Sequence, residues 1–214
     1  MNGLLYKDLL NLSSTTKYLV LVMLFFCVIF VPQGNELPVY ILLIIFGAML
    51  PMTVNTYDTT VRWDKYAASL PVTRKEIVWT RYQLMLIGMS VAGIISLIIA
   101  TMMTVLLPGE GVFLSVLDPL TLTVMFLACG LLVGSVILPL TLKFGNEVTR
   151  YIIIMIALVP VVVILGLTFL LLPSGLTFPI LPLSMIAGAL TAVAVIGVVV
   201  SYRLSVRIYM KKEF

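Results

Sequence analysis

Long runs without a charged side chain alternate with short charged segments along this chain. The charge-free runs cover residues 18–35, 37–57, 82–109, 119–142 and 151–202. A bilayer core of roughly 30 Å needs about 20 helical residues, so each of the first four runs predicts one membrane-spanning helix. The last run is long enough for two helices, and Pro173 and Gly175, with Pro179 and Pro182 after them, are expected to separate the two.

The pattern therefore predicts an all-α, polytopic membrane protein with one domain over residues 1–214. The six expected transmembrane helices cover residues 16–32, 37–54, 84–107, 120–142, 151–172 and 183–202. The sequence shows none of the alternating segments that build membrane β-barrels.

Composition supports a lipid environment for most of the chain. Of the 214 residues, 62% are hydrophobic and only 10% are charged, and the mean hydropathy is +1.21. A water-soluble domain normally carries about 25% charged residues. A soluble fold of this size would leave much of this apolar surface in water.

All 13 lysines and arginines fall on one side of the predicted arrangement. They lie before the first apolar run, between spans 2 and 3, between spans 4 and 5, and after span 6: Lys7, Lys17, Arg62, Lys65, Arg74, Lys75, Arg81, Lys143, Arg150, Arg203, Arg207, Lys211 and Lys212. The opposite side carries three acids and no base. The positive-inside rule then places both chain ends in the cytoplasm. The net charge of +4 is explained by topology and by attraction to anionic lipid, and no nucleic-acid partner is expected.

Several kinds of chemistry are disfavoured. The apolar runs contain no ionisable side chain, which argues against an ion-coupled carrier and an intramembrane enzyme. The chain has no histidine for serine–histidine catalysis or histidine metal sites, and no Gly-rich phosphate loop. We therefore expect no catalytic residue, no metal and no cofactor bound by this chain.

Small residues recur at a spacing of four in two predicted spans. Span 3 carries them at Gly88, Ala92, Ser96, Ala100 and Thr104, and span 4 has Gly130 and Gly134. Such residues let helix backbones approach closely, either within one chain or between subunits.

The segment 55–83 between spans 2 and 3 predicts two helices. The first is expected over residues 58–70, begins at Asp58 and is amphipathic. Its apolar stripe consists of Trp63, Tyr66, Ala67 and Leu70. Such a stripe can lie on the membrane surface or dock into a groove on a soluble partner, and the residues leave both open.

The second helix of this segment follows Pro71, which ends the first. Thr73 and Glu76 match the capping-box pattern of a helix N-terminus. A helix is therefore expected to begin at Arg74 and to continue into span 3.

One pattern runs through this segment, and a second one opens the chain. The first consists of Asp58, Trp63, Asp64, Lys65, Tyr66, Ser69, Leu70, Pro71, Val72, Arg74, Lys75, Glu76, Ile77, Val78, Arg81 and Tyr82, and the second of residues 4–10, LLYKDLL. Together with the six-helix organisation they resemble the permease subunits of bacterial type-2 ATP-binding-cassette (ABC) exporters. The resemblance is strongest to small permeases related to the phenol-soluble modulin exporter, and it covers essentially the whole chain.

The resemblance implies a location in the bacterial cytoplasmic membrane and an elbow helix over residues 3–14 along the inner leaflet. It also implies a coupling helix that contacts a cytoplasmic ATP-binding subunit. The expected contact residues are Trp63, Asp64, Tyr66, Leu70, Pro71, Thr73, Arg74, Lys75 and Glu76. A second contact is expected at Lys143, Asn146, Glu147 and Arg150. ATP and Mg would be bound by the partner ATPase.

The family further implies a dimer, so a second permease copy or a paralogue joins membrane lipid among the expected partners. The expected cargo is an amphipathic peptide, such as a toxin or an antimicrobial peptide, and a lipid or a hydrophobic drug stays open. A stand-alone membrane protein, for example an immunity or sensor protein, is the alternative from another class.

Overall fold

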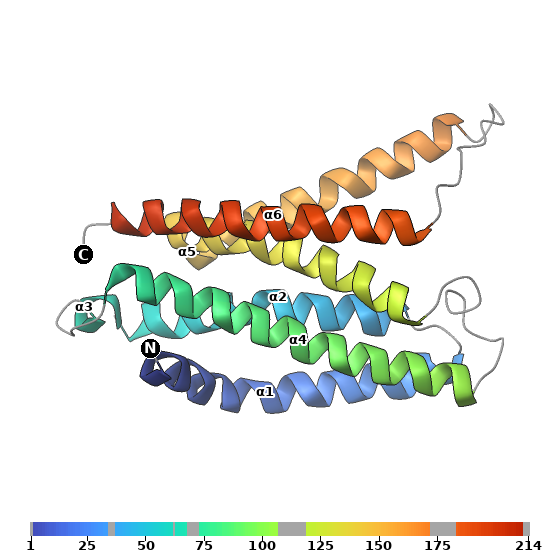
Figure 1. Ribbon diagram of the computed structural model, residues 1–214, viewed down its shortest axis with the longest axis horizontal. Helices are drawn as coiled ribbons and strands as arrows, with labels where there is room; N and C mark the ends of the chain where they lie inside the picture. Colours follow the sequence, from blue (N-terminus) through green and yellow to red (C-terminus); the bar gives the residue numbers. More distant parts are fainter. Residues whose placement is uncertain are drawn as a thin grey trace.

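Long helices lie side by side in the structure, a computed structural model of the chain (Figure 1). The structure describes residues 2–33, 37–61, 63–67, 73–106, 119–171 and 183–211. Within these ranges every regular element is a helix, which confirms the predicted all-α class.

The chain begins with α1 (Asn2–Phe30), a short 3₁₀ turn η1 (Val31–Gln33) and α2 (Leu37–Thr60). The short α3 (Trp63–Ala67) precedes α4 (Arg74–Leu106), α5 (Pro119–Leu171) and α6 (Leu183–Met210). The N-terminal end of α1, the C-terminal end of α6 and α3 lie at one end of the bundle (Figure 1). We call it the basic end, because the described parts of the segments rich in lysine and arginine meet there.

Helix α5 consists of two arms joined at Gly145, where the backbone has φ 78° and ψ 175°. This combination is open essentially only to glycine. The first arm runs toward the basic end and the second turns back from it (Figure 1). The reversal falls within residues 143–150, which the sequence predicts as the link between two spans.

Several described helices are suited to a membrane. Four stretches are long and apolar enough to cross it, namely Pro38–Thr60, Arg74–Met102, Pro119–Ile152 and Ala187–Met210, and Val20–Gln33 is a shorter apolar helix. The protein is thus a multi-pass membrane protein, while six spans and the orientation stay predictions. The predicted elbow, residues 3–14, and the predicted first span share the single helix α1, so the structure marks no boundary between them.

The predicted small-residue positions bring helices together within the chain. A Cβ added at Gly88 of α4 would overlap with the side chain of Leu50 in α2 and lie 3.3 Å from the carbonyl oxygen of Gly47. A Cβ at Gly134 of α5 would lie 2.5 Å from the sulfur of Met85 in α4. Ala92, like Gly88, is buried. These positions therefore serve intrachain packing, and the side chain of Thr104 lies outside the described set.

The Gly145 backbone gives a first prediction. Replacing Gly145 by Ala should lower the free energy of unfolding by about 1–3 kcal/mol, because alanine has to adopt a glycine-only conformation. The surrounding space is open, with nothing within 4 Å of an added Cβ, so the loss would come from the backbone alone. The measurement is thermal unfolding of the purified protein in detergent.

Gly188→Ala is the matched control for this change. Gly188 also has nothing within 4 Å of an added Cβ, but it lies in regular helix in α6. Alanine there should leave stability unchanged or raise it by up to about 1 kcal/mol. Equal melting temperatures for the two variants would show that the Gly145 conformation is not required.

Candidate functional site

Side chains from most helices meet in a hydrophobic cluster at the basic end. Its buried members are Ala67, Ile77, Val78, Tyr82, Met85, Leu138, Leu142 and Tyr209, from α3, α4, α5 and α6. Leu4 of α1 and Trp63 of α3 pack against it. Because both Trp63 and Ala67 contact this cluster, the short α3 is fastened to the bundle.

The predicted amphipathic helix over residues 58–70 was wrong at its start. Asp58 belongs to α2, which continues through Thr60, and α3 begins only at Trp63. The apolar stripe is also divided between two environments. Trp63 is half-buried and Ala67 is buried, whereas Tyr66 is 59% exposed. Much of the stripe therefore packs against the chain itself, an outcome that neither of the two alternatives included.

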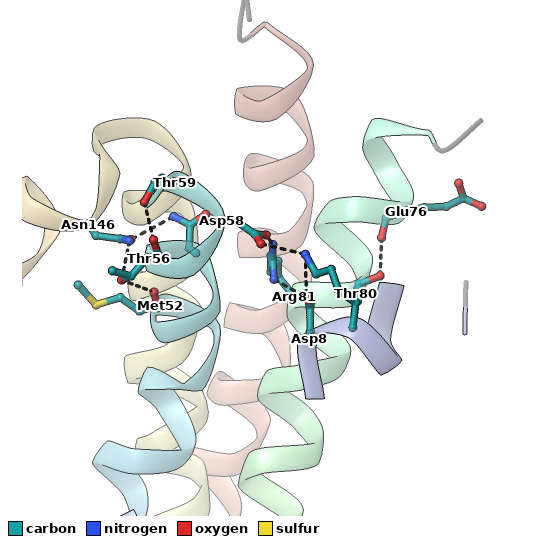
Figure 2. A network of polar contacts seen from close by, with 11 residues as sticks. Asp8, Met52, Thr56, Asp58, Thr59, Glu76, Thr80, Arg81 and Asn146 are labelled. Atoms are coloured by element: carbon teal, nitrogen blue, oxygen red, sulfur yellow. Dashed lines mark hydrogen bonds and ion pairs between the residues drawn. The ribbon is translucent and has the colours of Figure 1, made fainter. Parts of the chain in front are cut away.

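A group of charged side chains from three helices explains where Asp58 lies. Arg81 of α4 is placed between Asp8 of α1 and Asp58 of α2 (Figure 2). Its Nη1 donates to Asp8 Oδ2 at 2.7 Å, and its Nη2 donates to Asp58. Lys7 Nζ lies 2.9 Å from Asp58 Oδ1 and 3.1 Å from Asp8 Oδ1. We call these residues, Lys7, Asp8, Asp58 and Arg81, the charge cluster.

The charge cluster is buried and balanced. Asp8, Asp58 and Arg81 are 2%, 3% and 5% exposed, and the two acids face two bases. Removing one member of such a group leaves an uncompensated buried charge, which typically costs 3–5 kcal/mol. The cluster therefore holds α1, α2 and α4 in one register.

The charge cluster also reaches α3. Lys7 Nζ lies 4.0 Å from the centroid of the Trp63 ring, within range of a cation–π interaction. The indole N–H of Trp63 is buried and has no hydrogen-bond partner among the described residues. The position of Trp63 thus depends on its packing and on Lys7.

A second polar contact fastens the α5 reversal to α2. Asn55 Nδ2 donates to Asn146 Oδ1 at 3.0 Å, and Asn146 Nδ2 donates to Thr56 Oγ1 at 2.8 Å (Figure 2). Asn146 is 7% exposed. In this structure Asn146 is an internal packing residue, and its contact with a partner stays a prediction.

The predicted capping box is confirmed at the start of α4. The Thr73 backbone N–H donates to Glu76 Oε2 at 2.8 Å, and the Glu76 N–H donates to Thr73 Oγ1 at 3.3 Å. Arg74 Nη1 donates to the Met210 carbonyl at 2.8 Å and so satisfies an acceptor at the C-terminus of α6. The start of α4 is thereby attached to the end of α6.

The other predicted contact residues lie mainly on the surface. Thr73, Arg74, Lys75, Lys143, Glu147 and Arg150 are exposed. Glu147 and Arg150 form an exposed pair at 3.8 Å. Asp64 lies in α3 but its side chain is outside the described set, as are Leu70 and Pro71.

The charge cluster is what the sequence interpretation missed. The sequence analysis used its members as topology charges, as a helix start and as parts of the family pattern, and it predicted no contact among them. A usable signal was present, because Asp58 and Arg81 directly border the charge-free runs 37–57 and 82–109 and carry opposite charges. Among the residues that the structure describes, no group of acids and thiols could hold a metal ion.

Breaking the charge cluster should destabilise the protein strongly. Arg81→Met would leave Asp8 and Asp58 buried with only Lys7 between them, and we expect a loss of about 3–5 kcal/mol in unfolding free energy. Arg203→Met changes an exposed arginine of α6 and should stay within about 0.5 kcal/mol of the parent. Unfolding in detergent measures both, and similar losses for the two variants would contradict this role.

The chain matches one protein-family model over residues 3–210, and that family is described as ABC-2 family transporter protein. The match extends from the start of α1 to the end of α6 and includes the charge cluster and both predicted contact segments. No curated protein and no solved structure matches the chain.

Proposed function

Because the chain belongs to the ABC-2 family of transporter proteins, we propose that it exports amphipathic peptides. Membership of this family makes it the membrane-spanning permease subunit of an ABC transporter. ATP is hydrolysed by a cytoplasmic partner subunit of such a transporter. The peptide cargo, the outward direction and a permease dimer are the parts that we propose.

The observation that carries the coupling proposal is the continuity of α4. This helix has 33 residues, which corresponds to about 50 Å, and it begins at the capping box beside α3. A displacement applied at Arg74 and Lys75 would therefore tilt a single stiff element that reaches across the membrane. ATP can drive such a tilt only if the ATPase contacts the permease differently in its two states.

We propose that the ATPase binds the exposed residues of the α3–α4 segment. Tyr66 and Arg74 belong to residue types that are frequent among interface hot spots, and Lys75 adds a second positive charge. Leu70, Pro71 and Asp64 belong to the same proposed contact. Trp63 would act from within, by holding α3 against the bundle, and Lys143, Glu147 and Arg150 would form the second contact.

The cargo proposal draws on an apolar groove between α1, α2 and α4. The groove has a volume of about 260 Å³ and is lined by residues that include Leu12, Met23, Phe46, Leu84 and Ile87. Its lining suits the apolar side chains of an amphipathic peptide. A lipid or a hydrophobic drug would suit the same lining and is the alternative cargo.

The coupling proposal is tested by purifying the tagged protein in mild detergent from its own host. We expect an ATP-binding subunit in stoichiometric amount. The double variant Tyr66→Asp, Lys75→Glu should lose most of this subunit. It places a negative charge at the aromatic contact and reverses the positive charge of Lys75. Quantitative mass spectrometry of the complex measures the ratio of the two chains.

Tyr6→Asp is the matched control for the partner test, because Tyr6 of α1 is 65% exposed, close to the 59% of Tyr66. It should retain the ATPase subunit. Unchanged melting temperatures of both variants would separate lost binding from lost folding. A parent preparation that contains this chain alone would favour the stand-alone class, and retention by the double variant would remove α3–α4 from the contact.

The cargo proposal predicts that amphipathic peptides accelerate ATP hydrolysis by the reconstituted complex. Added lipids and hydrophobic drugs should leave the rate unchanged at matched concentrations. Stimulation by a lipid or a drug alone would move the cargo to that class.

A further inference from the structure

Lys17 of α1 lies at the depth of the middle of α4. Leu12, which precedes it on α1, packs in a cluster with Leu84 of α4. Met23, which follows it, packs in a cluster with Ala92 of α4. Lys17 is thus bracketed between two contacts that lie on either side of the centre of the apolar stretch Arg74–Met102. The sequence interpretation had placed it before the first apolar run.

The charge cluster marks the edge of the membrane at the basic end. Tyr82, next to Arg81, has its hydroxyl 2.6 Å and 2.8 Å from the hydroxyls of Ser201 and Ser205 in α6. Arg203 lies between these two serines and is exposed, which is the position of a residue at the headgroup level. Arg81 and its partners therefore lie at about this level.

The distance along α1 then gives the depth of Lys17. Residues 8–17 of one helix cover about 14 Å at a rise of 1.5 Å per residue. A bilayer core of roughly 30 Å has its midplane about 15 Å from each edge. The contacts of Leu12 with Leu84 and of Met23 with Ala92 place Lys17 level with about residue 88 of α4, roughly 10 Å from Arg81. Lys17 therefore lies inside the hydrocarbon core.

The surroundings of Lys17 on the single chain are open. Its side chain is exposed, and α1 packs against α2 and α4 and leaves its outer side uncovered in the described structure. The pairs found among the described residues include none for Lys17. Leu10, Leu21 and Leu24 on the same side are 54%, 66% and 61% exposed.

Hydrocarbon does not suit this part of α1. An ionisable side chain inside the hydrocarbon core is costly in lipid and normally faces a water-filled cavity or a partner. The polar sequence NLSSTTK of residues 11–17 precedes the apolar run 18–35 and ends at Lys17. The acids whose side chains the structure describes, Asp8, Asp58, Glu76 and Glu147, lie at the basic end, so a second copy in the same orientation would bring none of them to this depth.

We propose that the outer side of α1 lines a water-filled path and that Lys17 binds a carboxylate of the peptide cargo there. The proposal rests on the function proposed above, since the path is the one that the cargo takes. A lysine ammonium is a strongly hydrated point charge on a flexible stem, which suits a transient contact with a passing anion. The groove between α1, α2 and α4 is lined on α1 by Leu12 and Val20, which flank Lys17 in the sequence, and it would receive apolar side chains of the same cargo.

The test measures water and charge at Leu21, one turn beyond Lys17. Both natural cysteines, Cys27 and Cys129, are replaced by Ser, and Leu21→Cys is introduced into the full chain in membranes. The thiol is reacted with an anionic sulfonate reagent and with a cationic ammonium reagent, both water-soluble. A lipophilic maleimide confirms that the thiol is present.

We expect both water-soluble reagents to modify the Leu21→Cys thiol. Lys17→Gln should lower the ratio of the anionic to the cationic rate about tenfold, because a unit charge about 6 Å away in water changes each rate about threefold in opposite directions. Lys17→Arg, which keeps the charge, should preserve the ratio.

Two outcomes would overturn this proposal. Reaction with the lipophilic maleimide alone would place this side of α1 in lipid, with Lys17 extended toward lipid phosphates. A ratio unchanged by Lys17→Gln would show that Lys17 does not attract anions. The same membranes are assayed for the bound ATPase subunit. Absence of this subunit would indicate failure of the proposed function. Its presence together with a negative labelling result would refute the Lys17 proposal alone.

Discussion

A guanidinium held between two carboxylates at one edge of the bundle is the interaction on which the rest of the structure depends. Arg81 joins α4 to Asp8 of α1 and to Asp58 of α2, and Lys7 completes the balance of charge. In a buried site this arrangement is stable only while every member is present. The charge cluster therefore allows one register for the three helices. Hydrophobic packing alone would discriminate less sharply between registers, because lipid chains are as apolar as the helices.

Both predicted contact segments are attached to the same part of α2. Asp58 connects through Lys7 to Trp63 of α3, and Asn55 and Thr56, less than one turn away, hold Asn146 at the α5 reversal. A displacement of α3 would therefore reach the α5 loop through a few hydrogen bonds. A permease that responds to one ATPase subunit through two loops needs a connection between those loops. Here the connection runs through one short stretch of α2, from Asn55 to Asp58.

The sequence predicted what depends on local pattern and missed what depends on side chains meeting from distant segments. The helical class follows from long apolar runs, and the start of α4 at Arg74 follows from Thr73 and Glu76, which interact within one turn. The extent of α2 past Asp58 could not be predicted in this way. Local pattern makes that aspartate a helix start, and only its pairing with Arg81 and Lys7 explains its burial within a helix. The division of the Trp63–Tyr66 stripe likewise depends on the surface that α3 meets.

The register set by Asp8 has a consequence for Lys17. Moving α1 by a turn or two toward the basic end would bring Lys17 nearer to the headgroups, but it would separate Asp8 from Arg81. The gain from moving Lys17 is at most about 2.5–3.5 kcal/mol, the cost of a lysine at the bilayer centre, and the loss from breaking the buried pair is about 3–5 kcal/mol. Because the two magnitudes are similar, the Asp8–Arg81 pair alone would not keep Lys17 in hydrocarbon. Helix α1 would then populate more than one register. If Lys17 lies in water, moving α1 brings no gain in free energy for this lysine. The charge cluster then suffices to explain the observed register.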